Sequence, residues 1–272
     1  AFPIELTEGT TSQFSPNRLC YLNNKLSGSG NLQLNIPYLR EYVSFNVDDF
    51  TGRLIANGVS SEKEGSLLLL QKGKENLAHV VVEAKGNARL AAWNTNADCQ
   101  LGGLSGTSTT YLSGSSKSTA NFTCSWTVGG ANTDETFNGK INNWAAGGSK
   151  YKGKVSIIKV GTGEWRLTGA NDYAGTTTVK AGTLIVNGTH SGTGAVTVSK
   201  DATLKGKGTL AGRVSVVSGG TVAAGDTLVN AENLKLKGGL SLLAGSTVNI
   251  PLYAQDGKAK ANKITVAGNF VI

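Results

Sequence analysis

The chain has 272 residues, of which 37 are glycine and only 4 are proline, and 39% of its residues are hydrophobic. Glycine at this level, set among recurring valines and threonines, predicts many short strands joined by tight turns and excludes a disordered chain. The formal net charge is +8, but the lysines are scattered, which argues against a nucleic-acid partner. No apolar run has the length of a transmembrane helix, so we expect no membrane insertion by this segment.

The N-terminal part of the chain shows strands with an irregular repeat. Residues 36–50 alternate apolar and polar side chains in a way that favours a strand over a helix. Gly28 to Leu34 follows the pattern G-x-G-x-[LW]-x-L, and an aromatic-x-Gly segment comes after it at Phe50 to Leu54. The same two patterns return at Gly161 to Leu167 and Tyr173 to Thr177. We interpret them as a strand, an excursion, and a return to the next coil.

From residue 177 onward the repeat becomes regular. Apolar residues or threonines recur in pairs two positions apart, and each pair returns after about 18–20 residues, the range of a solenoid repeat. The pairs of the first series begin at Thr177, Val196, Val214 and Leu234, and those of the second at Leu184, Leu204, Val222 and Leu242. Side chains two apart face the same side of a strand, so we expect these residues to line an interior. Thr197, Ser215 and Lys235, which lie between them, are expected outside.

These spacings predict an all-β protein whose coils of about 18–25 residues stack along one axis. Three short strands per coil would close a triangle, and each coil would pair in parallel with the next at about 4.8 Å. We treat residues 1–272 as one β-helix solenoid, with irregular coils over 1–153 and regular coils over 154–272. An antiparallel sandwich or barrel would also give short strands, but with a shorter period and a turn dipeptide between every strand pair.

Two adjoining segments carry a recognisable motif. Gly161 to Val198 contains Gly-Thr-Gly, a tryptophan, Leu-Thr-Gly-Ala-Asn, Tyr-x-Gly-x-Thr, Gly-Thr-Leu and Val-Asn-Gly in that order. This segment and its continuation, Ala202 to Leu228, resemble the autotransporter-associated β-strand repeat of bacterial passenger domains. The resemblance covers about a quarter of the chain. It implies a right-handed parallel β-helix, a single-stranded solenoid, on an exported protein, and it implies no particular activity.

The two ends of the chain suggest a segment of a longer protein. Ala1 to Pro3 lack the charged and apolar regions of a signal peptide. At the other end, Lys263 to Val266 followed by Phe270 to Ile272 resembles an unfinished coil. Taken with the resemblance, this predicts part of a bacterial protein that is secreted or displayed on the cell surface.

The carboxylates do not show the spacing of a polysaccharide-degrading site. Such a site needs carboxylates at i and i+2 on a strand, or one coil apart on neighbouring strands. The pairs Asp48–Asp49 and Asp134–Glu135 are adjacent in sequence, so a strand would point their members to opposite faces. Asp201 and Asp226 are separated by more than one coil of this region. We therefore predict no catalytic residue, no cofactor and no metal site, and interpret these groups as solvated corner residues.

The histidines and tryptophans give one candidate contact. Neither His79 nor His190 accompanies a nucleophile motif, and His190 lies in a run of glycine, threonine and serine that predicts an exposed turn. Large aromatic side chains are more often buried than exposed. Trp144 is the candidate for carbohydrate contact, because it lies in the polar run 142–148 and an exposed indole stacks on sugar rings.

The three cysteines leave two outcomes open. The spacing of Cys99 and Cys124 is close to one coil, so their Cα atoms could lie within disulfide range. Stacked strand neighbours, however, point their side chains in parallel, and a free thiol packs well as a small core residue. We favour buried thiols over a bridge and expect Cys20 to be unpaired in either case.

The function expected from these features is structural rather than catalytic. The chain would be a rigid stalk or adhesin-like scaffold within a larger surface protein. It would act as a monomer, with a surface polysaccharide or a host surface as its partner. The alternative is a polysaccharide-active β-helix enzyme similar to pectate lyase, or the accessory C-terminal segment of one.

Overall fold

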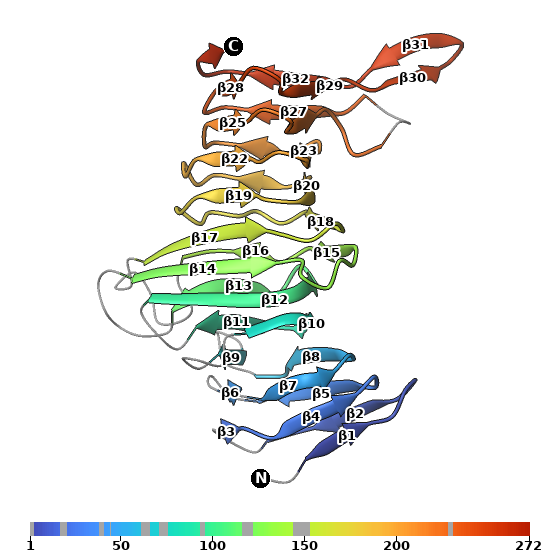
Figure 1. The fold of residues 1–272 in the computed structure, drawn as a ribbon, viewed down its shortest axis with the longest axis vertical. Helices are drawn as coiled ribbons and strands as arrows, with labels where there is room; N and C mark the ends of the chain where they lie inside the picture. The colour runs from blue at the N-terminus through green and yellow to red at the C-terminus, as the bar shows by residue number, and fades with distance from the viewer. Residues whose placement is uncertain are drawn as a thin grey trace.

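The chain is a parallel β-helix, as the sequence predicts. The computed structural model describes residues 3–16, 21–37, 41–43, 45–60, 66–70, 76–92, 96–115, 122–143, 153–227 and 231–272. Every regular element within these residues is a β-strand, and the strands of the stack pair in parallel. Figure 1 shows the coils lying above one another along a single long axis, with the two termini at opposite ends. The right hand implied by the resemblance is the one that parallel connections adopt as a rule.

Each coil passes through three faces. The strands of the first face are β1 (Ile4–Leu6), β4 (Lys25–Gly28), β7 (Asn46–Phe50), β14 (Phe122–Val128), β17 (Gly153–Lys159), β19 (Thr177–Val179), β22 (Val196–Val198), β25 (Val214–Val216), β28 (Leu240–Leu242) and β33 (Phe270–Val271). Those of the second face are β2 (Thr11–Phe14), β5 (Asn31–Ile36), β8 (Arg53–Gly58), β15 (Glu135–Phe137), β18 (Glu164–Leu167), β20 (Gly182–Val186), β23 (Ala202–Lys205), β26 (Thr221–Ala223) and β29 (Thr247–Asn249). Two long strands, β10 (Asn76–Gly86) and β12 (Asn96–Gly106), run through both faces.

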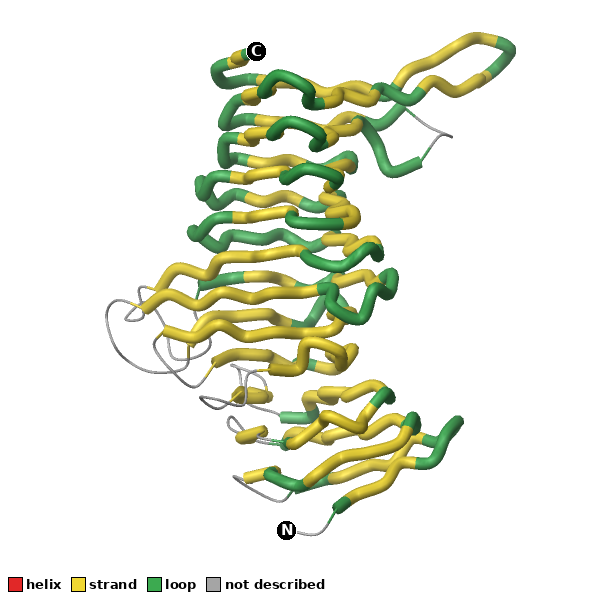
Figure 2. Tube along the Cα trace, viewed as in Figure 1, coloured by secondary structure: helices red, strands yellow, loops and turns green. Residues whose placement is uncertain are grey.

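The third face completes the triangle. Its strands are β3 (Tyr21–Leu22), β6 (Glu41–Val43), β9 (Ser66–Leu70), β11 (Ala88–Ala92), β13 (Tyr111–Ser115), β16 (Lys140–Ile141), β21 (Thr189–His190), β24 (Thr209–Leu210), β27 (Asn233–Leu236) and β32 (Lys263–Val266). An antiparallel hairpin of β30 (Leu252–Gln255) and β31 (Lys258–Ala261) projects from the stack near the C-terminal end. Figure 2 shows that the turns and loops gather at the corners, between strands that lie above one another.

The predicted ladder is correct for three of its four rungs. Thr177 pairs with Val196, and Val196 pairs with Val214, but the next rung is Leu240 and not Leu234. Leu234 belongs to the third face, where it pairs with Ile264. The slip arises because an extra loop follows β26, so the step from Val214 to Leu240 is longer than the steps before it.

The same loop displaces the second predicted series. Leu184 pairs with Leu204, and Leu204 with Val222, as expected. The following rung is Val248, whereas the predicted Leu242 pairs with Val216 on the first face. The sequence period therefore predicts the register only up to the inserted loop.

The predicted division between inside and outside is largely correct. All four residues of the predicted inner series are buried, and Lys235 is exposed. Thr197 and Ser215 are half-buried rather than exposed. The reason is the parallel register, which places Ser215 between Thr197 and Ser241 on the outer surface, so that each side chain is flanked by its neighbours.

Some of the N-terminal coils are longer than predicted, whereas others, such as the coil from Leu32 to Leu54, lie within the predicted range. Leu54 pairs with Val82, and Trp126 pairs with Ile157, and both steps exceed the predicted coil length. Insertions between strands lengthen these coils while the strand ladders stay parallel. Strand pairing continues from β14 to β17, across the predicted boundary at residue 153. The division into irregular coils before this boundary and regular coils after it stays a prediction.

Cys99 and Cys124 are buried and are not joined by a disulfide, as favoured from the sequence. The coil is slightly longer than their spacing in sequence, so Cys124 pairs with Ala97, and Cys99 pairs with Trp126. The two thiols are therefore offset by two positions along neighbouring strands. Cys20 lies outside the described residues.

Replacing Val214 with aspartate should strongly destabilise the protein. Val214 is fully buried between Val196 and Leu240, so the new carboxylate would have neither water nor a partner. We expect Val214→Asp to lower the free energy of unfolding by more than about 3 kcal/mol in chemical denaturation. Lys235→Ala on the exposed surface is the control and should change it by less than about 0.5 kcal/mol. Equal effects of the two changes would contradict the observed register.

Candidate functional site

The predicted carbohydrate contact, Trp144, lies outside the described residues, as does Trp93. The other two tryptophans are core residues. The indole N–H of Trp126 donates to the carbonyl oxygen of Ser113 (2.9 Å), and that of Trp165 donates to the carbonyl oxygen of Leu104 (2.9 Å). Both side chains are buried inside the stack with their N–H groups hydrogen-bonded, so neither ring is exposed for stacking on a sugar.

The carboxylates singled out in the sequence fall into two groups. Those that are exposed, as predicted for solvated corners, are Asp48, Asp49, Asp134 and Asp201. Glu135 and Asp226 are different: their side chains are only 5% and 10% exposed, and each pairs with an arginine. The solvated interpretation is wrong for these two because loops fold them back against the outer surface. Among the described residues, no group of three or more histidine, cysteine or acidic side chains is arranged to hold a metal ion.

We call the first of these pairs, Arg53 with Glu135, the N-terminal clasp. The guanidinium donates two hydrogen bonds to the carboxylate, Nη1 to Oε2 (3.2 Å) and Nη2 to Oε1 (2.8 Å). The hydroxyl of Thr133 adds a third hydrogen bond to Oε1 (3.1 Å). Arg53 lies on β8 and Glu135 on β15, so the pair bridges over β10 and β12.

Two glycines of β12 allow the loop that carries the N-terminal clasp to pack closely against the stack. The loop of residues 129–134 folds back along the stack, and the backbone N–H of Ala131 donates to the carbonyl oxygen of Gly102 (2.9 Å). A Cβ atom on Gly103 would come within 2.9 Å of Cγ of Glu135. The absence of a side chain at Gly103 therefore leaves the space that Glu135 occupies.

The second pair, Arg166 with Asp226, forms the C-terminal clasp. Arg166 donates from Nε to Oδ2 (3.0 Å) and from Nη2 to Oδ1 (3.1 Å), and the amide of Asn187 donates to Oδ2 (2.8 Å). Arg166 lies on β18, and Asp226 follows β26, three coils further along the stack. Ile185, whose neighbours on the outer ladder are Arg166 and Lys205, is fully buried although it faces outward.

Glu232 anchors the other end of the same loop. Its Oε2 accepts hydrogen bonds from the backbone N–H groups of Asp226 (2.5 Å) and Thr227 (2.8 Å), and its Oε1 accepts one from Nζ of Lys207 (2.9 Å). The amide oxygen of Asn262, in the next coil, accepts from the backbone N–H of Glu232 (3.0 Å). The loop is thereby tied both to earlier coils and to the following one.

The surroundings of Asp226 and Glu232 keep both carboxylates ionised. Burial raises the pKa of Asp226, but hydrogen bonds from Arg166 and Asn187 outweigh it, and the pKa lies below its ordinary value. For Glu232, burial is likewise outweighed by hydrogen bonds from Thr227 and Lys207, so its pKa is also lowered. The hydrogen bond to Asp226 raises the pKa of Arg166. The C-terminal clasp is therefore a charged pair at neutral pH.

Arg166→Met should destabilise the protein in a pH-dependent way. The variant leaves Asp226 without its bidentate donor, and since Arg166 is about a third exposed we expect a loss of about 1–3 kcal/mol at neutral pH. Because the folded-state pKa of Asp226 is lowered, its contribution is present above about pH 4 and is lost as the pH falls through the folded value. The difference from wild type, measured by urea denaturation, should shrink in that range.

The exposed pair of Lys25 and Asp49 provides the control for this measurement. Lys25→Met should leave the unfolding midpoint unchanged, because a solvated ion pair contributes little. A loss from Arg166→Met that stays the same at every pH would show that the guanidinium acts by packing rather than by charge.

His190 is buried, which corrects the prediction of an exposed turn. Its ring stacks on that of Tyr173, with 4.0 Å between the centroids and 21° between the planes. Its Nδ1 lies 3.4 Å from the carbonyl oxygen of Asn171, and its Nε2 has no hydrogen-bond partner among the described residues. The position points inward because His190 stacks below Leu210 in the third-face ladder. Burial lowers the pKa of His190, although the Asn171 carbonyl and the charge of Asp172 oppose this shift.

His190 should make the fold sensitive to mild acid. Its folded-state pKa is lowered, so the unfolded chain binds the proton more readily, and stability falls as the pH drops below about 6.5. His190→Leu, which continues the ladder of Leu210, should remove this loss between about pH 6.5 and pH 5. The measurement is the thermal midpoint across this range. Tyr173→Phe keeps the imidazole and should retain the wild-type slope; a slope that persists in His190→Leu would contradict the assignment.

Lys159 is an inward-facing lysine that the sequence analysis missed. It lies in the same ladder as Val128 and Val179, and its Nζ donates to the carbonyl oxygens of Val160 (2.6 Å), Gly161 (3.0 Å) and Ala181 (3.3 Å). Burial lowers its pKa to about 8, against the opposing charge of Asp134. The amine thus satisfies carbonyl groups of two successive corners from inside the stack.

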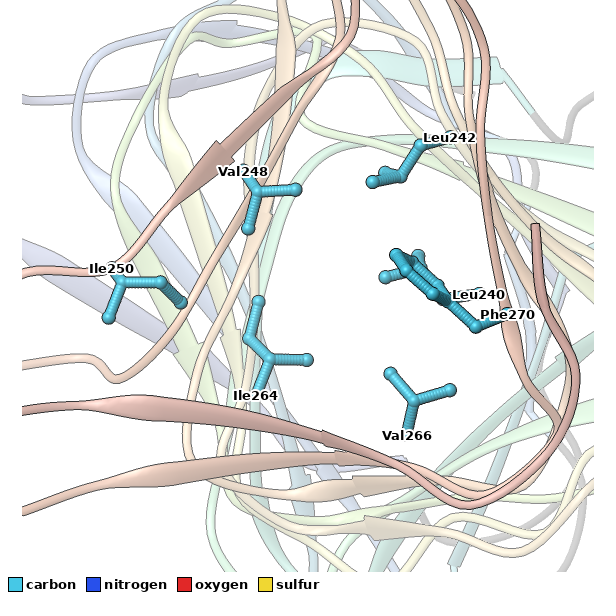
Figure 3. Close-up of a pocket in the computed structure, with 7 residues that line it drawn as sticks. All are labelled: Leu240, Leu242, Val248, Ile250, Ile264, Val266 and Phe270. Carbon is cyan, nitrogen blue, oxygen red and sulfur yellow. The ribbon is translucent and has the colours of Figure 1, made fainter. Parts of the chain in front are cut away.

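An apolar pocket of about 440 Å³ opens at the C-terminal end of the stack. Figure 3 shows its lining side chains converging from the walls of the last described coil. They are Leu240, Leu242, Val248, Ile250, Ile264, Val266 and Phe270. Every lining residue is aliphatic or aromatic, and several continue the ladders of earlier coils, so the pocket is chemically a continuation of the core.

Comparison with known families supports the motif found in the sequence. The profile of the family described as passenger-associated-transport-repeat matches residues 157–186, which run from β17 to the end of β20. The resemblance to a passenger repeat is thereby confirmed for this stretch. No curated protein matches the chain. No helix in the described parts of the chain is long and apolar enough to cross a membrane.

Proposed function

We propose that this chain is a non-catalytic, rigid scaffold within the passenger region of a secreted or cell-surface bacterial protein. It acts as a monomeric stalk that holds other parts of the protein away from the cell. Its outer surface is available for adhesin-like contact with a surface polysaccharide or a host surface. The observation that carries the proposal is the parallel ladder of buried side chains, which continues from coil to coil past the matched repeat at residues 157–186.

The two clasps support a mechanical role. In a solenoid each coil contacts only its neighbours, so stiffness depends on the weakest interface between two coils. The N-terminal clasp and the C-terminal clasp each join coils that are not neighbours. Bending at an interface between two coils that a clasp spans would have to break the bidentate ion pair of that clasp as well as the strand ladder.

The arrangement of the carboxylates favours the scaffold over the enzyme alternative. Polysaccharide-cleaving sites need carboxylates that face one another or share a cation across a groove. Here Glu135, Asp226 and Glu232 each accept hydrogen bonds from cationic side chains or backbone N–H groups. Their oxygens stabilise the fold rather than facing a substrate.

Rigidity is tested by measuring distances between spin labels along the stack. Cysteines introduced at Glu8 and Asn138 give a shorter span, and cysteines at Glu8 and Lys237 give a longer one, all at exposed positions. Cys20→Ser serves as the background, since the other two native thiols are buried. A rigid scaffold predicts two narrow distance distributions of equal width by double electron–electron resonance. A width that grows with the span would indicate a jointed chain and contradict the proposal.

The non-catalytic part has a separate test. We expect the chain, incubated with polygalacturonate with and without calcium, to release neither reducing ends nor unsaturated uronides detectable by ultraviolet absorbance. Release that the variant Arg53→Met abolishes would instead favour the enzyme alternative.

A further inference from the structure

A polar groove lies on the outer surface between the first and second faces, beneath the loop of the N-terminal clasp. Its volume is about 490 Å³, which is within the range of small-ligand sites. Figure 1 shows the loop that leads into β15 projecting at the edge of the stack, alongside β12 and β10. The residues that line the groove are Ser29, Asn31, Thr51, Gly52, Arg53, His79, Val81, Ala131 and Thr133.

Two rows of residues form the walls. Asn31, Arg53 and Val81 come from β5, β8 and β10, whose strands pair in order along the second face. Ser29 and Thr51 precede these strands at the corners of two successive coils. The groove therefore runs along the stack. Ala131 and Thr133 of the overhanging loop cover its C-terminal end.

The floor of the groove requires glycine. A Cβ atom on Gly52 would collide with the carbonyl oxygen of Gly30, so the corner cannot accept any other residue without moving. The small floor, together with the largely buried side chain of Val81, leaves room for a ring-sized ligand between the polar walls.

Both hydrogen-bond donors and acceptors face this space. Nε2 of His79 lies 2.7 Å from the carbonyl oxygen of Val47, so Nε2 carries the proton and Nδ1 is left as an acceptor. The side-chain oxygen of Asn31 accepts from the backbone N–H of Arg53 (3.0 Å), which fixes the orientation of the amide. The hydroxyl of Ser29 can donate and accept, whereas those of Thr51 and Thr133 donate to the carbonyl oxygen of Gly28 (3.5 Å) and to Oε1 of Glu135 (3.1 Å) and are left as acceptors.

The charge of the groove is balanced. Arg53 is the one fully charged group among the lining residues, and Glu135 neutralises it through the bidentate pair. An anionic ligand would have to compete with that carboxylate, whereas a neutral polyol can bond to the outer N–H groups and oxygens of the pair without separating it. Fixed donors and acceptors around a small apolar floor are complementary to the hydroxyl groups and ring of a neutral sugar.

We propose that this groove binds a neutral saccharide, with one or two sugar units lying along the stack between Arg53 and His79. The overhanging loop limits the site to the end of a glycan chain. Ser29 and His79 define the mouth, and the N-terminal clasp holds the loop in position. This proposal does not rest on Trp144, and it does not depend on the scaffold function.

Saturation-transfer difference NMR on the whole chain tests the proposal. The probes are maltose, cellobiose, lactose and mannobiose, with digalacturonate as the charged comparison. We expect a saturable signal from at least one neutral disaccharide and a weaker or absent signal from digalacturonate. His79→Ala should weaken binding about tenfold through the loss of an acceptor, and Ser29→Trp should abolish it by filling the mouth.

Gln33→Ala is the matched control, because Gln33 lies on the same strand and face as Asn31 but outside the groove. This variant should bind as wild type does, and the melting curves of all three variants should confirm that they fold. The proposal is overturned if none of the neutral disaccharides saturates, if digalacturonate binds more tightly than they do, or if His79→Ala and Ser29→Trp bind as well as wild type. None of these outcomes affects the spin-label distances that test the scaffold.

Discussion

The structure depends on one constraint: an inward side chain of a coil can be buried only by the coils on either side of it. Parallel stacking meets this constraint by placing like residues above one another, as Thr177, Val196, Val214 and Leu240 show. For a polar group on the inside, only the stack itself can then supply a hydrogen-bond partner. Lys159 donates to three corner carbonyls, and Trp165 reaches back to the carbonyl of Leu104.

If each coil contacted only its nearest neighbours, each interface between two coils could open without affecting the other interfaces. The clasps change this, because Glu135 and Asp226 reach back over intervening strands to Arg53 and Arg166. Their energies are modest, since each arginine keeps about a third of its side chain exposed. Their effect lies in coupling: opening one interface beneath a clasp also removes hydrogen bonds made across the others. Cooperativity thereby extends beyond adjacent coils.

The sequence predicts the stack wherever turns are short, and fails where loops are inserted. Between Thr177 and Val216 the period alone gives the correct rungs, because corners there add few residues. The loop after β26 adds residues to the repeat, so the period assigns Leu234 to the wrong face. The burial of Leu234 is nevertheless predicted correctly. The partners in the clasps are 82 and 60 residues apart, and their meeting depends on the lengths of several coils. The burial of His190 could have been predicted from the sequence, because His190 stands one repeat before Leu210, which is buried.

The inserted loops that defeat the period also create the surface features that distinguish one part of the stack from another. The regular coils between Thr177 and Val216 have short corners, and their outer ladders include the half-buried side chains of Thr197 and Ser215. The loop of residues 129–134 is free to vary because it lies at a corner, where extra length does not disturb the ladder. By folding back over Gly102 and Gly103 it forms both the N-terminal clasp and the roof of the groove. The ion pair that joins coils which are not neighbours therefore also preorganises the polar wall of the proposed saccharide site.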